Sequence, residues 1–177
     1  MSAIRDLKTF IDTLNATDPA HYAQVVKRLD LAPEAFDGFA FWDADGYTRN
    51  CIERTDDYEL ILLCWSRGDR TPVHGHADQN CWVYQIDGTV HEVRYDLDDD
   101  GALRETDRAS LEPGDLTYMH DAMGYHHIEN VSCGRAMTMH IYAAPIDACE
   151  VYSDEANCFE VRSMEYHTMK GEEVLVD

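Results

Sequence analysis

The order of apolar and polar residues divides the chain into a helical first part and a β-rich remainder. In the first part, apolar residues recur at the three- and four-residue spacing of a helix, namely Ile4, Leu7, Phe10, Ile11 and Leu14. Asp18 followed by Pro19 is typical of a second helix start, because a carboxylate caps free amide groups and proline suits the first turn. The segment HYAQVVKRLDL is expected to continue this helix through Val25, Val26 and Leu29.

From about Trp42 the pattern changes to short apolar stretches separated by turn residues. YELILLCW is expected to be a buried strand, and CWVYQIDG and TVHEVRYDL are expected to form a hairpin around Asp87 and Gly88. DLDDDGALRET is expected to be a charged turn, and later strands are expected in EPGDLTYMH, GYHHIENV and RAMTMHIYAAP. Many short antiparallel strands with glycine and proline turns predict a mainly β fold, either a sandwich or a small barrel.

The length of 177 residues, without an internal repeat or linker, predicts one domain, with residues 1–40 helical and residues 41–177 forming the β-barrel. No apolar run approaches the ~20 residues that a membrane span needs. The N-terminal residues have no apolar signal core. The six cysteines form no C-x-x-C pair. Without a leader sequence, they are expected to be reduced thiols in the cytoplasm.

The charge balance is strongly negative, with 14 Lys and Arg against 35 Asp and Glu and a formal net charge of −21. Such a surface repels phosphate groups, which argues against nucleic acid and anionic membranes as partners. The acidity is compatible with a salt-rich cytoplasm, where ions screen self-repulsion, and equally with an acidic protein of an ordinary cell.

His74 and His76 are the first indication of chemistry in the sequence. In a strand, residues two apart point to the same face, so both imidazoles would be directed toward one point, as a metal ion requires. Alone the H-x-H pair is a weak signal, since one of two such histidines is usually just exposed. Imidazole nitrogen suits iron, zinc, copper or nickel.

The residues around this pair resemble the first motif of the cupin family, whose fold is a small β-barrel or jelly roll. The spacing of that motif fits Gly68, His74, His76, Cys81 and Gly88. In the motif, the position of Cys81 is commonly a metal-binding glutamate, so that carboxylate is missing here. The resemblance implies a cupin domain preceded by N-terminal α-helices.

PGDLTYMHDAMGYHHIEN resembles the second cupin motif, which supplies one more histidine, and His126 and His127 compete for this role. Alternation puts His126 with Ile128 on one face, and the spacing to Asn130 also favours His126. The alternative for His127 is a solvent-facing residue or one behind the site. The resemblance thus implies a metal site of three neutral histidines, His74, His76 and His126.

Five separated motifs resemble the cysteine dioxygenase family of cupin enzymes. They are YTRN from Tyr47, H-x-H-x4-C from His74, G-x-H-x-x-E-N from Gly124, T-M-H-I-Y from Thr138 and P-x-D-x-C from Pro145. The resemblance implies a mononuclear Fe(II) enzyme that adds both atoms of O2 to the thiol of L-cysteine and forms cysteine sulfinic acid. Thr138 replaces the usual serine of the family. Ala143-Ala144-Pro145 stands where many relatives have Ser-Pro-Pro, so a trans turn is expected there.

The resemblance also implies a catalytic group made of Tyr142, His140 and Cys81. His140, supported by Thr138, would orient the Tyr142 phenol toward the iron, and both His140 and Tyr142 would contact the substrate. Cys81 and Tyr142 match the residues that form a thioether crosslink in the animal-type enzymes. Outside this family context, the alternating residues Thr138, His140 and Tyr142 would be interpreted as core-facing groups with satisfied hydrogen bonds.

Arg49 is expected to clamp the substrate carboxylate with two parallel hydrogen bonds, supported by Tyr47 on the same face of its strand. Related enzymes acting on mercaptopropionate tend to have glutamine at the clamp and to lack the crosslinking cysteine, so Arg49 and Cys81 favour L-cysteine. Cys149 stands at a family position near the pocket without an assigned role. Trp65 and Trp82 are expected to be core residues.

The expected partners are therefore L-cysteine and O2, with Fe(II) as the cofactor and a monomer as the working form. Two other functions remain open from the sequence. One is a dioxygenase for another small thiol, such as mercaptopropionate, cysteamine or homocysteine. The other is a non-catalytic cupin that senses or stores a small ligand.

Overall fold

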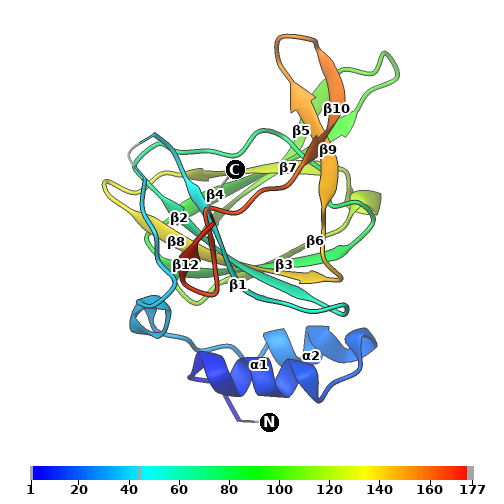
Figure 1. Ribbon diagram of the computed structural model, residues 1–177. Coiled ribbons are helices and arrows are strands. Elements are labelled where there is room, and N and C mark those ends of the chain that lie inside the picture. The colour runs from blue at the N-terminus through cyan, green and yellow to red at the C-terminus, as the bar shows by residue number, and fades with distance from the viewer. Residues whose placement is uncertain (1, 44, 175–177) are drawn as a thin grey trace.

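This computed structural model describes residues 2–43 and 45–174. Helical segments come first in the chain, and they lie along one side of the strands (Figure 1). They are α1 Leu7–Asn15, the 3-10 helix η1 Pro19–His21, α2 Tyr22–Val26 and the 3-10 helix η2 Pro33–Phe36. The Asp18 carboxylate accepts the Ala20 N–H at 2.9 Å, so the predicted cap is present. The predicted second helix is shorter than expected. It ends at Val26, because the chain then turns back and Leu29 forms a β-bridge with Ile4.

The strands form a β-barrel with a projecting hairpin, as the predicted mainly β fold requires (Figure 1). The largest sheet has the order β12-β11-β1-β2-β8-β3-β6, made of Glu172–Glu173, Thr168–Met169, Thr48–Arg54, Glu59–Trp65, Ala136–Ala143, Asn80–Asp87 and Leu116–Met119. A second sheet has the order β5-β4-β7, made of Leu103–Leu111, Val90–Leu97 and Tyr125–Asn130. A 3-10 turn, η3 Asp121–Met123, precedes β7, and the projecting hairpin is β9 Ala148–Ser153 with β10 Cys158–Ser163.

The large sheet is buried on both faces, and strand alternation divides its side chains between two cores. One core lies between the sheet and the helices and includes Phe10, Leu60, Leu62, Trp82, Tyr84, Met139 and Ile141. The other fills the barrel and includes Ile61, Leu63, Trp65, Cys81, Val83, Ile128 and Tyr142. Because β2 supplies both cores, all seven of its residues are buried, as predicted for YELILLCW. The same alternation on β8 sends Met139 and Ile141 to the helices and Tyr142 into the barrel.

The predicted hairpin around Asp87 and Gly88 is wrong. Strand β3 pairs with β6 and β8, whereas β4 pairs with β5 and β7, so the chain crosses from one sheet to the other at this turn. Gly88 has φ +72°, and a Cβ atom there would lie 2.8 Å from the Arg135 carbonyl oxygen. The Asp-Gly pair therefore marks a tight turn, as expected, but the turn joins two sheets.

Other differences lie where strands are exposed and lack an apolar pattern. The predicted charged turn is confined to Asp98–Ala102, because Leu103 already begins β5, most of whose residues face solvent. The β9–β10 hairpin was not expected from the sequence, and Val161 within it is 74% exposed. Among the described residues, no helix is long and apolar enough to cross a membrane.

Gly124, which opens β7, should be irreplaceable for steric reasons. Its φ is +90°, and an added Cβ would lie 2.2 Å from the Tyr95 carbonyl oxygen. We expect Gly124→Ala to lower the free energy of unfolding by more than about 2 kcal/mol in chemical denaturation. The matched control is Gly101→Ala, which has φ +79° but open space around it and should cost only about 1 kcal/mol. Equal losses for the two variants would contradict the steric explanation.

Candidate metal centre

The H-x-H segment lies between β2 and β3, where single β-bridges hold it in place. His74 forms one bridge with His126 of β7 and another with Val151 of β9. The His74 N–H donates to the His126 carbonyl at 2.9 Å, and the His126 N–H donates to the His74 carbonyl at 3.2 Å. The segment is thus no regular strand, contrary to expectation, but it directs both His74 and His76 into the barrel.

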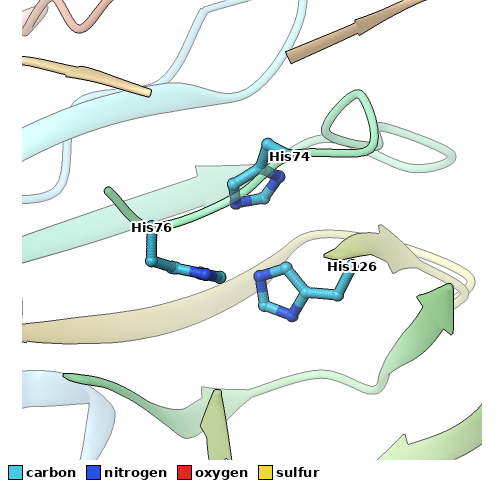
Figure 2. Close-up of side chains that lie close together, drawn as sticks. All are labelled: His74, His76 and His126. Atoms are coloured by element: carbon cyan, nitrogen blue, oxygen red, sulfur yellow. The ribbon is translucent and has the colours of Figure 1, made fainter. Parts of the chain in front are cut away.

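Three imidazole rings meet inside the barrel, turned toward one another from two segments (Figure 2). The ring centroids of His74, His76 and His126 lie 4.7 to 5.2 Å apart, and one nitrogen from each lies within 4.8 Å of the others. Both ring nitrogens of His76 and Nε2 of His126 are buried without a hydrogen-bond partner. Buried polar atoms normally have partners, so these free lone pairs fit a bound transition-metal ion.

The environment keeps the His74 and His126 rings in the neutral form that binds metals. Burial lowers the pKa of His126 well below its usual value, and repulsion from His76 adds to this effect. Burial likewise lowers the pKa of His74, together with repulsion from His126 and His76, although His74 keeps part of its surface exposed. At neutral pH a metal ion therefore does not have to displace a proton from either ring.

Hydrogen bonds on the outer side of the rings fix which nitrogen faces the centre. The Nδ1 atom of His74 lies 3.0 Å from the Pro72 carbonyl oxygen. The Nδ1 atom of His126 lies 2.8 Å from Oε1 of Glu92, a buried residue of β4. A carbonyl or carboxylate oxygen only accepts, so Nδ1 carries the hydrogen in both rings and Nε2 has the free lone pair.

Asp121 shapes the turn that follows His76. Its two oxygens accept the N–H groups of His76 and Asp78, and the latter bond is 2.7 Å long. Ala77 and Asp78 have positive φ angles of 51° and 59°, which are unfavourable for residues other than glycine, and the two hydrogen bonds help to hold the turn in this conformation. Burial raises the pKa of Asp121, but its hydrogen bonds to His76 and Asp78 outweigh that effect and lower it to about 2.

His127 takes no part in the cluster. It lies on the opposite face of β7, where its Nδ1 is 3.2 Å from the Tyr95 hydroxyl. The structure thus brings His126, and not His127, together with His74 and His76, as strand alternation predicts. His127 is nevertheless largely buried, so it is not the solvent-facing residue that the alternative suggested.

A chain of hydrogen bonds runs along the inner face of β8. The Trp65 indole N–H, which can only donate, donates to Thr138 Oγ1 at 3.0 Å. The same Oγ1 lies 3.0 Å from His140 Nε2. On the other side of the imidazole, His140 Nδ1 lies 3.4 Å from the Tyr142 hydroxyl oxygen. The chain therefore fixes the position of the His140 ring between Thr138 and Tyr142.

Cys81 and Tyr142 are directly opposite each other across β3 and β8. Directly opposite residues have Cβ atoms about 4.5–5.5 Å apart, so the thiol reaches the phenol. Burial raises the pKa of the Cys81 thiol, and a hydrogen bond with Tyr142 offsets this only in part. The predicted pair is thus in contact as a thiol and a phenol.

The turn after Tyr142 is trans, as expected, since none of the described residues has a cis peptide bond. Ala144 instead has φ +95°, a conformation that costs alanine about 1 kcal/mol or more. Its N–H donates to the Asp57 carbonyl at 3.0 Å, which helps to hold the turn in this conformation.

Arg49 stands where a cavity reaches the histidine cluster. An outer cavity of about 350 Å³ is lined by Tyr47, Arg49, His74 and Cys149, among others. An inner cavity of about 20 Å³ is lined by Arg49, His74, His76, Tyr142, Ile146, Cys149 and Met164. The Arg49 Nε donates to the Glu165 carbonyl at 3.1 Å, and within the described residues its terminal nitrogens make no hydrogen bond. They are free to bind an anion.

Tyr47 lies beside Arg49 and stacks on Trp65, with ring centroids 5.0 Å apart. Trp65 is a buried core residue, as predicted, but it also connects Tyr47 to the hydrogen-bond chain on β8. A larger cavity of about 440 Å³ lies between α2 and β3, away from the histidines.

Several residues of the site were not expected from the sequence. They are Glu92, Asp121, Ile146, Met164, Glu165 and His167, of which His167 accepts the Arg49 N–H through Nδ1 at 3.1 Å. Most of them are common polar or apolar residues on strands and turns whose pairing the sequence does not show. A buried-strand pattern with a charge inside, as in VHEVRYDL, is the one signal that could have indicated Glu92.

A β-barrel with three inward-facing histidines beside an arginine-lined cavity defines a protein of the cupin class with a site that could hold a metal ion. The chain belongs to the cysteine dioxygenase type I family, whose sequence profile matches residues 2–155.

Relatives of this family from animals match most of the chain. Cysteine dioxygenase type 1 of Rattus norvegicus is 26% identical over 176 residues, which cover 95% of this chain and 88% of the relative. The Danio rerio protein is 27% identical over 145 residues, which cover 79% of this chain and 72% of the relative. Similar solved structures include an RmlC-like cupin protein from Desulfovibrio desulfuricans, with TM-score 0.47, 15% identity and coverage of 60% and 91%. A double-stranded β-helix protein from Klebsiella pneumoniae has TM-score 0.49, 16% identity and coverage of 61% and 80%.

The buried neutral histidines should make the metal-free protein sensitive to acid. The pKa values of His74, His126 and His140 are lowered in the folded state, chiefly by burial, while in the unfolded chain they are near 6.5. The unfolded state therefore binds more protons below that pH, and stability falls as pH decreases. We expect a loss of about 1.4 kcal/mol per histidine between pH 7.5 and 5.5. Denaturation of His74→Gln should show a shallower loss by about that amount, and an unchanged pH profile would contradict the explanation.

Proposed function

We propose that this protein is a cysteine dioxygenase that uses Fe(II) and O2 to convert L-cysteine to cysteine sulfinic acid. The observation that carries the proposal is that His74 and His76, two members of the three-histidine cluster, line the same small cavity as Arg49 and Tyr142. Both oxygen atoms join the thiol sulfur and the thiol hydrogen is retained in the sulfinic acid. The reaction therefore balances without a reductant or a further cosubstrate.

The metal would be held by His74, His76 and His126 through one nitrogen each. When bound, Fe(II) would supply the redox chemistry that joins O2 to the thiolate sulfur. All three ligands are neutral, so the site keeps the positive charge of the ion. A positive site favours an anionic thiolate over the thiol and gives L-cysteine an advantage as a ligand.

Arg49 would bind the carboxylate of the substrate. Its guanidinium is planar, and Arg49 lines both cavities together with His74, which suits a bidentate pair with a carboxylate. Tyr47 would support this pose from the same wall. In a protein with net charge −21, a fixed cation inside the cavity also gives an anionic substrate a local partner.

Tyr142 would donate a hydrogen bond to the reacting atoms. Tyr142 lines the inner cavity, and the chain from Trp65 through Thr138 and His140 holds its hydroxyl group in place there. Burial raises the pKa of Tyr142 well above its usual value, so the phenol remains a donor throughout the working pH range.

Cys81 would form a thioether with the Tyr142 ring. The thiol S–H and one ring C–H bond break, a sulfur–carbon bond forms, and two electrons and two protons pass to O2. The bond would fix the ring and prevent the Cys81 thiol from competing with L-cysteine for the metal. Without the crosslink, Cys81 is a small buried side chain.

We expect a monomer that works in the cytoplasm, where the six free thiols stay reduced.

The acceptance of other thiols and the non-catalytic function are the alternatives that an experiment must separate. The decisive measurement is O2 uptake by anaerobically Fe(II)-loaded protein with L-cysteine, mercaptopropionate, cysteamine or homocysteine, with sulfinate identified by mass spectrometry. One O2 consumed per cysteine sulfinate is the expected result. Uptake with a different thiol alone would replace the substrate, and bound iron without any uptake would favour the non-catalytic function.

Replacing Arg49 should separate carboxylate recognition from chemistry. We expect Arg49→Gln to lower kcat/KM for L-cysteine by roughly 10- to 100-fold, since a charge-assisted pair is worth about 1.5–3 kcal/mol. Arg49→Lys should recover only part of the loss, because it keeps the charge and loses the fork. Any turnover of cysteamine, which has no carboxylate, should not fall. A variant with full activity on L-cysteine would exclude Arg49 as the clamp.

The crosslink should be visible in the intact mass after turnover with Fe(II), L-cysteine and O2. We expect a species lighter by two hydrogen atoms and a faster band on a denaturing gel, because the joined chain is more compact. Cys81→Ser should abolish both signals. Cys149→Ser is the matched control, since Cys149 also lines the inner cavity but does not face Tyr142 across a strand pair. An unmodified mass in the wild type would remove the crosslink from this mechanism.

A further inference from the structure

Glu92 is a buried carboxylate directly behind the histidine cluster. It is 1% exposed, and its Oε1 lies 2.8 Å from Nδ1 of His126. This is the shortest contact between a carboxylate and a ring nitrogen of the three histidines among the described residues, since Asp121 Oδ1 lies 3.6 Å from His76 Nδ1. A buried charge is costly unless it is paired, so its retention here needs a reason.

The second oxygen of Glu92 is held by two donors. Nη2 of Arg94 lies 2.9 Å from Oε2, and the Thr117 hydroxyl donates to the same oxygen at 2.8 Å. Arg94 also donates to the Tyr118 carbonyl at 2.9 Å and stands directly opposite His126 in the β4–β7 pair. Glu92 is thus fixed from one side and turned toward the metal cluster on the other.

We propose that Glu92 is a positioning residue that holds His126 with Nε2 toward the metal. Its carboxylate would lie behind a metal ligand, whereas in related motifs a carboxylate is itself a ligand. The inference rests on the metal site of the proposed function. A carboxylate that accepts from Nδ1–H fixes the tautomer and the ring orientation and makes the opposite nitrogen a better electron donor. Cys81 occupies the place where related motifs carry a ligating glutamate, so Glu92 supplies negative charge without taking a ligand position.

Glu92 and Arg94 then act on the metal in opposite directions. The carboxylate increases electron density on His126, and the guanidinium, which binds the same carboxylate, withdraws part of it. Removing the anion should favour Fe(II) over Fe(III), while removing the cation should favour Fe(III). A purely structural role in holding β4 would give no such difference in sign.

The test measures the Co(II) dissociation constant by competition with a chromophoric chelator and the Fe(III)/Fe(II) midpoint potential of the iron-loaded protein. We expect Glu92→Gln to weaken Co(II) binding by about 10- to 100-fold and to shift the potential to a more positive value. Arg94→Met should shift the potential to a more negative value. Shifts of the same sign in both variants, or unchanged Co(II) affinity in Glu92→Gln, would overturn the proposal.

Glu92→Gln leaves Arg94 unpaired and could prevent folding, so a double variant provides a second comparison of Co(II) affinity. Glu92→Gln with Arg94→Met removes both charges, and it should bind Co(II) more weakly than Arg94→Met alone. Glu59→Gln is the matched control: Glu59 is also buried and paired with an arginine, Arg54 at 2.9 Å, but it contacts no histidine. It should lower stability and leave Co(II) affinity unchanged, and an equal loss of affinity in Glu59→Gln would overturn the proposal.

These measurements need no turnover, so they can reject the positioning role of Glu92 independently of the proposed dioxygenase activity. Wild-type protein that consumes no O2 with any thiol, but loses Co(II) affinity on Glu92→Gln, would reject the dioxygenase and keep the positioning residue. A dioxygenase with unchanged metal affinity and potential in Glu92→Gln would do the reverse. Wild-type protein that binds neither metal would overturn both.

Discussion

The interior of this barrel depends on three imidazoles whose ring nitrogens lie close together, with His76 and His126 buried and His74 partly exposed. Each unpartnered polar atom inside a protein costs about 1–3 kcal/mol, and three of the ring nitrogens in the cluster lack partners. The surrounding structure must offset that cost, and it does so with a sheet that is packed on both faces. The helices therefore contribute to the site without touching it, because they bury the outer face of β2, β3 and β8.

The proton positions around the cluster are set by groups that can act in only one direction. The Pro72 carbonyl and the Glu92 carboxylate only accept, and the Trp65 indole only donates. The carbonyl and the carboxylate fix the tautomers of His74 and His126, so that Nε2 of each ring has its lone pair free.

The sequence predicts the site better than the strand pairing. Cys81 and His140 lie on regular strands, where alternation along the sequence indicates the face of each side chain, whereas His74 and His76 stand in a local motif on an irregular segment. The partner of a strand is not local, which is why the turn at Gly88 was read as a hairpin although it joins two sheets.

The same limit explains the missed residues. Glu92 reaches His126 only through the β4–β7 register, and Asp121 reaches His76 only because η3 folds beneath the turn. The exposed strands β5 and β10 carry no apolar alternation, so nothing in their composition distinguishes them from loops.

The single bridges at His74 have a consequence for the order of folding. This residue is held by His126 and by Val151, both of which follow it at long distance along the chain. Contacts of that kind form late, because the chain must first close large loops. The cluster is then assembled only when the barrel is nearly complete. A metal ion bound there would act mainly by slowing unfolding and would do little to speed folding, so metal supply would set the lifetime of the native barrel.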